Sequence, residues 1–503
     1  MTDRALSTDD PATDGIRLPT AADAQPDHSR RNRVVIALML AATFVVFLNE
    51  TIIGNALPDL MRELEITAST AQWLSTAFML TMAIVIPVTG FLMTRLTTRT
   101  VFILAMSLFS AGTALAAVAP GFEILLAGRV VQASGTAIMM PLLMTTVMTL
   151  VPPHERGKTM GNISIVMSVA PAAGPAISGV ILSVFDWRWI FILVLPIALG
   201  ALALGASRVQ NVTEPRKVPV DVLSVVLSAF AFGGLIYGLS SLGEAARGET
   251  FVAPWIPILV GLVALGAFVW RQLSLEKADK ALLDLRTFAS RGFTISIVIM
   301  MVMMAALFGT IILLPIYTQD VLGLDVLGSG LMLVPGSLLM GFAGPFVGRL
   351  YDRVGPRPLI LPGAIWVSVV LWSMAMLLNA TSPVWLVLAL HIALCVGLAF
   401  MFTPLFTSAL GSLRPQLYSH GSATIGTVQQ LAGAAGTALF IALLTVGSVA
   451  GEAAGASEID ALASGIHTAF LAGAIISLFA IVAAAFVPKP DPELVGAGMH
   501  GGH

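Results

Sequence analysis

The chain is poor in charge and nearly without cysteine. Of its 503 residues, 11% are charged and 57% are apolar, whereas a soluble domain carries about 25% charged and about 45–50% apolar residues. This is the composition of a membrane protein. The single cysteine, Cys395, lies in an apolar run. It excludes a disulfide framework and a paired-thiol metal site within the chain, and we interpret it as a small core residue.

Other absences exclude whole classes of function. The net charge of −2 lacks the basic excess that a nucleic-acid-binding surface needs. No G-x-x-x-x-G-K-[ST] loop occurs, so ATP is not the expected energy source. The sequence also lacks a nucleophile elbow and a His/Glu metal pair at helical spacing. We therefore expect neither an enzyme nor a bound cofactor or metal.

Long apolar runs fill most of the chain. A hydrocarbon core about 30 Å thick needs about 20 apolar helical residues, and only helices or closed barrels satisfy their backbone groups in lipid. Cutting the sequence at charged or Pro/Gly positions predicts an all-α polytopic membrane protein with fourteen spans. They cover approximately 34–57, 71–93, 101–119, 124–150, 158–184, 188–207, 221–242, 253–272, 292–318, 327–350, 358–379, 383–411, 416–447 and 466–487.

The basic residues predict how the chain is oriented. With the N-terminus inside, the segments assigned to the cytoplasm hold 22 of the 26 Lys and Arg. The outer loops keep Arg62, Arg188 and Arg247, and Arg129 falls within a span. Positive charge accumulates on the cytoplasmic side of membranes. The clean separation supports both the count of fourteen and a cytoplasmic location for both ends.

A short repeat relates the two halves of the chain. Residues 90–99 read GFLMTRLTTR and residues 348–357 read GRLYDRVGPR, so a Gly and two Arg recur 258 residues apart. Duplicated halves with a site between them are a transporter architecture. The predicted parts are a disordered tail (1–32), a six-helix bundle (33–207), an inserted helix pair with its linkers (208–290), a second six-helix bundle (291–488) and a flexible tail (489–503).

One acid lies deep in a predicted span. Glu50 sits in FVVFLNETIIGNALP, residues 44–58. A central membrane charge costs about 2.5–3.5 kcal/mol, so Glu50 must face a watery cavity, be paired or be protonated; a buried structural hydrogen bond is the alternative. At 1.5 Å per helical residue, Glu50 and Arg129 lie about 10 and 8 Å below the outer surface and can meet. Arg129 could instead snorkel to the interface.

Together the two residues could form a proton switch. Desolvation favours the protonated acid, and a neighbouring guanidinium favours the carboxylate. We expect protons and a cationic or polar substrate to compete for the deprotonated site. Neutralising Glu50 would also lower the cost of closing the site around it.

Glycine and proline mark two further helices. Gly174 and Pro175 in the fifth span, and Gly341, Gly344 and Pro345 in the tenth, predict bends and close helix contact. We expect these two helices to meet between the halves and to seal the outer route; ordinary tight packing is the alternative.

Polar residues and methionines near the spans predict parts of a substrate cavity. Methionine repacks easily around varied ligands, although such residues also fill cores or face lipid. The candidate cavity residues are Asn49, Asn55, Gln132, Met139, Gln319, His391 and Gln429.

Five motifs resemble those of the major facilitator superfamily and, within it, of the fourteen-helix drug:proton antiporter branch. ETIIGNALP at 50–58 and DWRWIF at 186–191 are typical of that branch. RVVQASG, from Arg129 through Gln132 to Gly135, resembles R-x-x-Q-G-x-G with Ala133 replacing a glycine. PAAGPAISG resembles the antiporter motif through Pro171, Gly174, Pro175 and Gly179. The loop signature G-x-x-x-D-R-x-G-x-R is matched by Gly348, Asp352, Arg353, Gly355 and Arg357.

The chain departs from this family pattern at two places. In the first copy of the loop signature, which starts at Gly90, Thr94 and Thr97 stand where Asp and Gly are expected. Only Arg95 and Arg99 remain for a charged contact there. The first-helix acid is Glu rather than Asp, and LNET at 48–51 resembles the lincomycin-resistance members.

The resemblance implies a major facilitator fold and export of amphiphilic drugs in exchange for protons. We expect a monomer in the bacterial cytoplasmic membrane, with protons as the coupling ion. The alternatives are an exporter of an endogenous metabolite or lipid, a facilitator without proton coupling, and a membrane sensor or scaffold that carries no flux.

Overall fold

Helices long enough to cross a membrane make up the protein. The computed structural model describes residues 29–211, 215, 219, 221–246 and 252–488. Within these residues every regular element is a helix, and fourteen helical segments are long and apolar enough to span a bilayer. The predicted all-α fold and its fourteen spans are confirmed. The C-terminal tail and most of the N-terminal tail lie outside the described residues.

The first six spans form the N-terminal bundle. Its first helix runs past the predicted end at residue 57 and through Pro58, because Leu60 is buried in an apolar cluster at that end of the bundle. The helices are α1 (Ser29–Glu63), α2 (Ala68–Arg95), α3 (Thr98–Ala117), α4 (Phe122–Leu150), α5 (Arg156–Leu182) and α6 (Arg188–Arg208).

The last six spans form the C-terminal bundle, and two spans lie between the bundles in sequence. The inserted pair consists of α7 (Val222–Ser228), the π-helical segment η3 (Ala229–Gly233) and α8 (Gly234–Ala246), which form one span, and α9 (Trp255–Glu276). The C-terminal bundle contains α10 (Arg291–Ile316) with the π-helical segment η5 (Tyr317–Val321), α11 (Val326–Val354), α12 (Arg357–Leu377), α13 (Val384–Gly411), α14 (Tyr418–Ala453) and α15 (Glu458–Ala485).

The repeat continues beyond the loop signature. A short 3₁₀ turn, η2 (Pro153–Glu155), precedes α5, and a matching turn, η6 (Pro415–Leu417), precedes α14 262 residues later. The same separation relates Gly135 in α4 to Gly397 in α13, and Arg129 to His391. The second bundle therefore carries a histidine at the position where the first carries its buried arginine.

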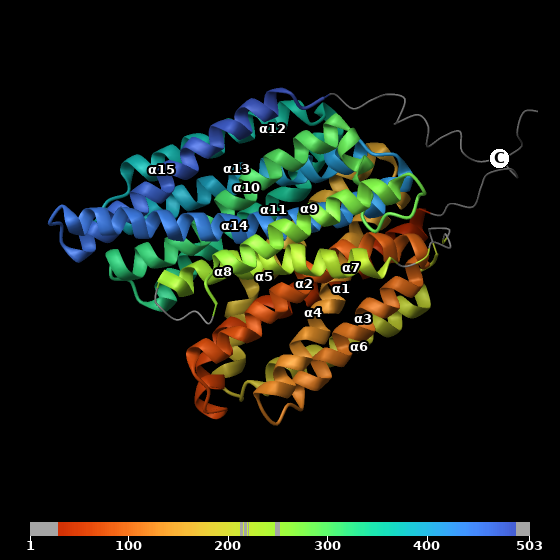
Figure 1. Ribbon diagram of the computed structural model, residues 1–503, viewed down its shortest axis with the longest axis horizontal. Coiled ribbons are helices and arrows are strands. Elements are labelled where there is room, and N and C mark those ends of the chain that lie inside the picture. Colours follow the sequence, from red (N-terminus) through yellow and green to blue (C-terminus); the bar gives the residue numbers. More distant parts are fainter. Residues whose placement is uncertain (1–28, 212–214, 216–218, 220, 247–251, 489–503) are drawn as a thin grey trace, which may run out of the picture.

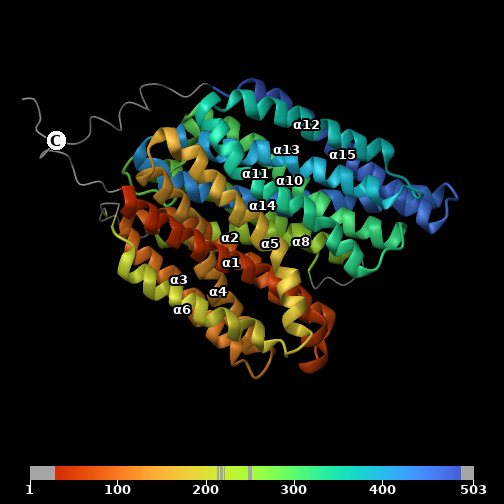
Figure 2. The same cartoon turned by 180° about the vertical axis from the view of Figure 1, so that it is seen from behind.

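The two bundles meet at one end and diverge at the other (Figures 1 and 2). We call the end where α1 begins and α15 ends the terminal end, and the opposite one the far end. Two hydrogen bonds that join the bundles lie toward the terminal end: Thr145 Oγ1 to Ser422 Oγ at 3.1 Å and Ser164 Oγ to Thr403 Oγ1 at 2.7 Å. The far end is the more open one.

Glycines bring α5 and α11 into backbone contact at the terminal end. A Cβ on Gly161 would lie 2.3 Å from the carbonyl oxygen of Gly344, and one on Gly348 would lie 2.0 Å from that of Gly157. No side chain fits at such distances, so the two helices touch through their backbones. The predicted contact between these helices exists and lies toward the terminal end; the sealing of the outer route by these helices stays a prediction.

Asp352 extends this contact at the start of α5. Its Oδ1 accepts a hydrogen bond from the backbone N–H of Gly157, and its Oδ2 accepts one from that of Lys158, both at 2.8 Å. A carboxylate here satisfies free backbone donors and the positive end of the helix dipole. The carboxylate of the loop signature thus caps a helix of the other bundle. Gly355 ends α11 with a φ of +79°, which favours glycine.

The matching contact between α2 and α14 has a threonine at the position where the first contact has its carboxylate. Thr94 occupies the position equivalent to Asp352, and its Oγ1 lies 3.4 Å from both Ser419 Oγ and His420 Nε2. A Cβ on Gly90 would lie 3.2 Å from His420 Nδ1. The Thr94 hydroxyl thus makes longer contacts with α14 than the Asp352 carboxylate makes with α5.

The inserted pair covers the α2–α14 side. Phe232 and Phe268 pack edge to face, with ring centres 5.9 Å apart, in one cluster with residues of α2 and α14. Toward the far end, Trp73 of α2 stacks on Tyr237 of α8, with ring centres 5.9 Å apart. The pair therefore contacts both bundles.

Replacing Gly161 with valine should force the terminal end apart. The added side chain would overlap the Gly344 backbone, and overpacking of this kind costs about 1–3 kcal/mol, so the equilibrium should move about 5- to 150-fold toward separated ends. Spin labels at positions 99 and 353 would report the distance between the bundles. Gly179→Val is the matched control on α5, because nothing lies within 4 Å of its Cβ position; unchanged distances for Gly161→Val would contradict this account.

An ion pair joins Asp221, which directly precedes α7, to Arg271 on α9. It makes the stability of the folded protein depend on pH. Arg271 donates from Nε to Asp221 Oδ2 at 2.7 Å and from a second nitrogen to Oδ1 at 2.8 Å. These bonds lower the pKa of Asp221. The stabilisation is complete above the ordinary aspartate pKa of about 3.9 and is lost as pH falls through the lowered folded value.

Asp221→Asn should therefore reduce the free energy of unfolding by about 1 kcal/mol at pH 7. The difference from wild type should disappear as pH falls below the lowered pKa of folded Asp221. Thermal unfolding of the purified protein in detergent measures both. Asp279→Asn is the control: it removes a more exposed partner of Arg286 and should change stability little. If the effect of Asp221→Asn does not depend on pH, the stabilising role of the Asp221–Arg271 ion pair is wrong.

Candidate transport site

Arg129 lies buried at the centre of a polar network in the N-terminal bundle. Its side chain is 1% exposed. Nη1 donates to Gln132 Oε1 at 2.7 Å and to Asn49 Oδ1 at 3.3 Å. Gln132 Nε2 in turn donates to Thr113 Oγ1 at 2.8 Å. Residues of α1, α3 and α4 thus hold the guanidinium in place, well inside the bundle rather than at an interface.

Glycines on α3 and α4 create the close packing that buries this network. A Cβ on Gly112 would lie 2.4 Å from the backbone nitrogen of Gln132, and one on Gly135 would lie 2.4 Å from the carbonyl oxygen of Ala105. The Arg-x-x-Gln-x-x-Gly spacing therefore has a physical basis. Gly135 lets α4 pack closely against α3. Arg129 and Gln132, on the same face of α4, then reach their hydrogen-bond partners.

Glu50 stands beside this network without joining it directly. Asn49, the preceding residue, takes the hydrogen bond from Arg129 and is 1% exposed, whereas Glu50 is partly exposed. Glu50 is thus the chain neighbour of a residue that is hydrogen-bonded to Arg129. Within the described residues no direct ion pair or hydrogen bond joins Glu50 to a partner. The acid is near a positive charge and is not tied to it.

The antiporter motif on α5 packs against the same part of α1. A Cβ on Gly174 would lie 2.1 Å from Thr51 Oγ1, so glycine is required where α5 meets the residue after Glu50. Gly174 therefore belongs to a contact within the N-terminal bundle, whereas Gly344 contacts the other bundle. Pro171 and Pro175 lie within α5, which continues through both.

The remaining predicted cavity residues lie in several different places. His391 is 2% exposed, packs against Gly336 of α11, and its Nε2 lies 3.3 Å from the carbonyl oxygen of Leu333. Gln319 donates to Ser329 Oγ at 3.2 Å, inside the C-terminal bundle. Gln429 is partly buried on α14. Asn55 lies in α1, and its side chain is outside the described residues.

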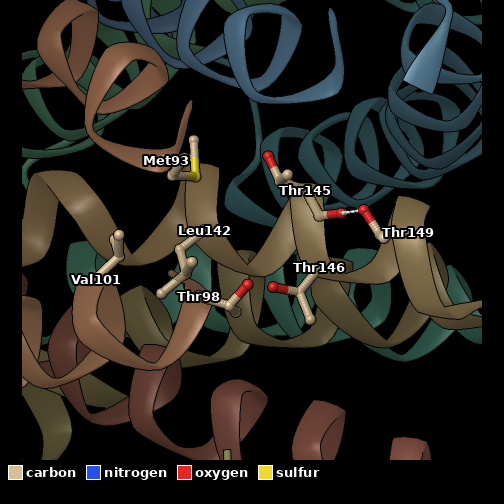
Figure 3. A pocket seen from close by; sticks show the side chains of 7 residues that line it. All are labelled: Met93, Thr98, Val101, Leu142, Thr145, Thr146 and Thr149. Carbon is tan, nitrogen blue, oxygen red and sulfur yellow. Dashed lines mark hydrogen bonds between the residues drawn. The ribbon is translucent and has the colours of Figure 1, made fainter. Parts of the chain in front are cut away.

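Met139 and a small cavity belong to the interior of the N-terminal bundle. Met139 is fully buried in the main apolar core. The cavity lies between α2, α3 and α4, has a volume of about 10 Å³ and carries threonine hydroxyls on its wall (Figure 3). This is the size of one water molecule, so it cannot hold a drug-sized compound. It is lined by Met93, Thr98, Val101, Leu142, Thr145, Thr146 and Thr149.

The DWRWIF motif organises the far end of the N-terminal bundle. Trp187 is 1% exposed and sits in the apolar cluster that also holds Leu60. Arg188 forms an ion pair with Glu63 and donates to the carbonyl oxygen of Ala119 at 3.3 Å. The motif thus joins the end of α1, the α3–α4 turn and the start of α6.

Comparison with known proteins decides the family. Residues 39–437 match the model of the Major Facilitator Superfamily. The chain belongs to this family. It is 40% identical over 460 residues to a lincomycin resistance protein, LmrB, of Listeria monocytogenes, covering 90% of this chain and 96% of that one. It is 39% identical over 458 residues to the MFS-type transporter YcnB of Bacillus subtilis, covering 91% and 95%. A multidrug resistance protein B homolog of Mycobacterium tuberculosis is 29% identical over 453 residues.

Solved structures agree on the fold. The proton:xylose symporter XylE superposes with a TM-score of 0.64 at 16% identity, covering 93% of this chain and 99% of that one. The human organic anion transporter MFSD10 gives a TM-score of 0.61 at 14% identity, covering 92% and 100%. This superfamily member is therefore a membrane transporter, in a family of transporters rather than enzymes.

Two residues of the site are not found by sequence reasoning. Thr113 accepts the bond from Gln132, and Phe78 of α2 lies over the guanidinium with its ring centre 4.1 Å from Arg129 Cζ. Both lie in helices whose apolar residues surround the whole helix, so no periodic signal marks the face that turns toward α4.

Gln132→Leu should destabilise the N-terminal bundle. The substitution removes the 2.7 Å acceptor of a buried guanidinium, and a hydrogen bond to a charged group contributes about 1.5–3 kcal/mol. We expect a comparable loss in the free energy of unfolding, measured by thermal unfolding in detergent. Ser134→Ala is the control on α4, because this exposed hydroxyl bonds only to its own helix at Val130; an equal loss in both variants would refute the role of Gln132.

Proposed function

We propose that this transporter exports amphiphilic compounds, cationic or polar ones included, in exchange for protons, with Glu50 as the proton-binding group. The observation that carries the proposal is an acid that lies beside a buried, anchored arginine and is itself left without a direct partner. Such an acid can take up and release a proton without breaking a strong ion pair. Glu50 is thereby suited to respond both to pH and to a cationic ligand.

The anchoring of Arg129 supports a role for its charge in this exchange. A buried guanidinium with two side-chain acceptors stays in place when Glu50 changes its protonation state. When Glu50 is charged, the site has a nearby negative group that a cationic or polar compound can use. When Glu50 is protonated, the site carries excess positive charge and its hold on such a compound weakens. Proton binding and substrate binding then exclude each other.

The distribution of charge supports an orientation for the cycle. Of the 20 described Lys and Arg, 17 lie in segments toward the terminal end, which favours a cytoplasmic location for that end. On this basis the structure corresponds to an outward-facing state, closed toward the cytoplasm by α5 and α11. In this state a proton would enter from outside and bind Glu50. Substrate would leave through the same opening.

The names of similar proteins support the substrate class. Relatives at 38–40% identity are named lincomycin resistance proteins, and a more distant one a multidrug resistance protein homolog. Lincomycin is therefore the first compound to test, followed by amphiphilic cations. We expect the protein in the cytoplasmic membrane of a bacterium, as a monomer.

Glu50→Gln should abolish proton-driven transport. Inverted vesicles with an imposed pH gradient would be assayed for uptake of lincomycin and of the fluorescent cation ethidium. General acid–base roles of one side chain are commonly worth 10²–10⁴-fold, so we expect a loss of about 100-fold or more. Glu50→Asp keeps a carboxylate and should retain coupling with a changed rate or pH optimum.

Three results would count against the proposal. Wild-type uptake by the Glu50→Gln protein would exclude Glu50 as the coupling group. Transport by the wild-type protein that is insensitive to an uncoupler would favour a facilitator, and ligand binding without any counterflow would favour a sensor. Glu63→Gln at the far end is the control, because this acid pairs with Arg188 on the surface.

A further inference from the structure

An aromatic ring from α2 covers the guanidinium of the site. Phe78 is 1% exposed, and its ring centre lies 4.1 Å from Cζ of Arg129. An aromatic face attracts a cation at this distance, and the attraction is strongest when the pair is removed from water. Both side chains are buried here. Phe78 is thus an attractive partner of Arg129 and more than a filler of space.

The ring and the hydrogen bonds hold Arg129 in complementary ways. Nη1 donates hydrogen bonds to Asn49 and Gln132, while Cζ lies over the ring of Phe78. Arg129 Nε has no hydrogen-bond partner among the described residues. A free donor on a guanidinium beside an acid would favour a direct pair with that acid. The structure has no such pair between Arg129 and Glu50, so other contacts oppose it.

We propose that Phe78 is a positioning residue that keeps Arg129 on Asn49 and Gln132 and out of a direct ion pair with Glu50. This inference rests on the proposed function, because it explains how the acid stays free to exchange protons. Without the ring, the guanidinium can turn toward Glu50 and hold it as a carboxylate. Proton uptake by Glu50 would then require a more acidic medium.

No other described charge competes with this arrangement. The helices packed against α1 are α2, α4, α5 and α6. Among the described charged side chains on these four helices, that of Arg129 is the buried one. A shift in the titration of Glu50 on changing Phe78 is therefore expected to act through Arg129.

The same face of α2 continues to the other bundle. Phe78, Met82 and Ile86 follow each other at four-residue spacing and share one apolar cluster. Gln430 of α14 donates to Met82 Sδ at 3.8 Å, and a Cβ on Gly426 would lie 3.0 Å from Ile86 Cγ2. The residues of this cluster on α2 therefore contact both the guanidinium, through Phe78, and the C-terminal bundle, through Met82 and Ile86.

Phe78→Leu is the test, because it removes the ring and keeps an apolar side chain. Infrared difference spectroscopy of the purified protein would follow the carboxylic-acid band of Glu50 against pH, the band being assigned by its loss in Glu50→Gln. We expect the midpoint to move down by up to about 1.5 pH units, the equivalent of a desolvated cation–π contact. Phe78→Tyr keeps the aromatic face and should retain the wild-type midpoint.

Two controls separate positioning from a general loss of packing. Met82→Ala opens space in the same cluster but leaves the ring on Arg129, and should not move the midpoint. In an Arg129→Gln background, Phe78→Leu should cause no further shift. A wild-type midpoint in Phe78→Leu, or an equal shift in Met82→Ala, would overturn the proposal. Should Phe78→Leu fail to purify as a single species, Phe78→Met replaces it.

The titration needs no substrate, so its outcome is distinguishable from that of the transport assay. A shifted midpoint together with normal transport by Glu50→Gln would keep the positioning role and remove the proposed coupling. An unshifted midpoint together with inactive Glu50→Gln would keep the coupling and remove the role of Phe78.

Discussion

The backbone contact between α5 and α11 is the constraint on which the arrangement of the two bundles depends. Gly157 and Gly161 on one helix meet Gly344 and Gly348 on the other with no room for a side chain. Such a surface is either in contact or apart, because an intermediate gap would forfeit the packing without admitting water. This favours movement of the bundles as rigid bodies between discrete states over gradual deformation.

The two bundles are joined unequally, although they are related by a repeat. On one side the Asp352 carboxylate caps α5, and on the other Thr94 makes longer, neutral contacts with α14. The inserted pair lies on the weaker side and packs on α2 and α14. On the α2–α14 side, apolar packing by the inserted pair accompanies the loss of the charged contact. The difference between the two copies of the loop signature is thus matched by a difference in the helices that surround them.

Sequence reasoning could predict the elements that depend on length, depth and spacing. The fourteen spans followed from hydrocarbon thickness. The depth of each residue along its helix predicted that Glu50 and Arg129 could meet. The loop signature located the carboxylate that caps α5. Each of these depends on distance along the chain, which the sequence contains directly.

What could not be predicted depends on how each helix is rotated about its axis. Asn49 rather than Glu50 accepts from Arg129, and Phe78 rather than a polar group covers it. The helices are apolar on every side, so the usual amphipathic signal is missing. For the same reason the position of His391 could not be predicted. We expected it to line a cavity, and it packs inside the C-terminal bundle.

The ring stack between Trp73 and Tyr237 has a consequence for how the molecule meets the lipid. It places α8 across the flank where α2 and α14 would otherwise part, whereas the flank of α5 and α11 has no such cover among the described helices. The lipid therefore borders one flank that α8 covers and one flank that no described helix covers. Spreading of the far end changes the boundary with the surrounding acyl chains mainly along the uncovered flank.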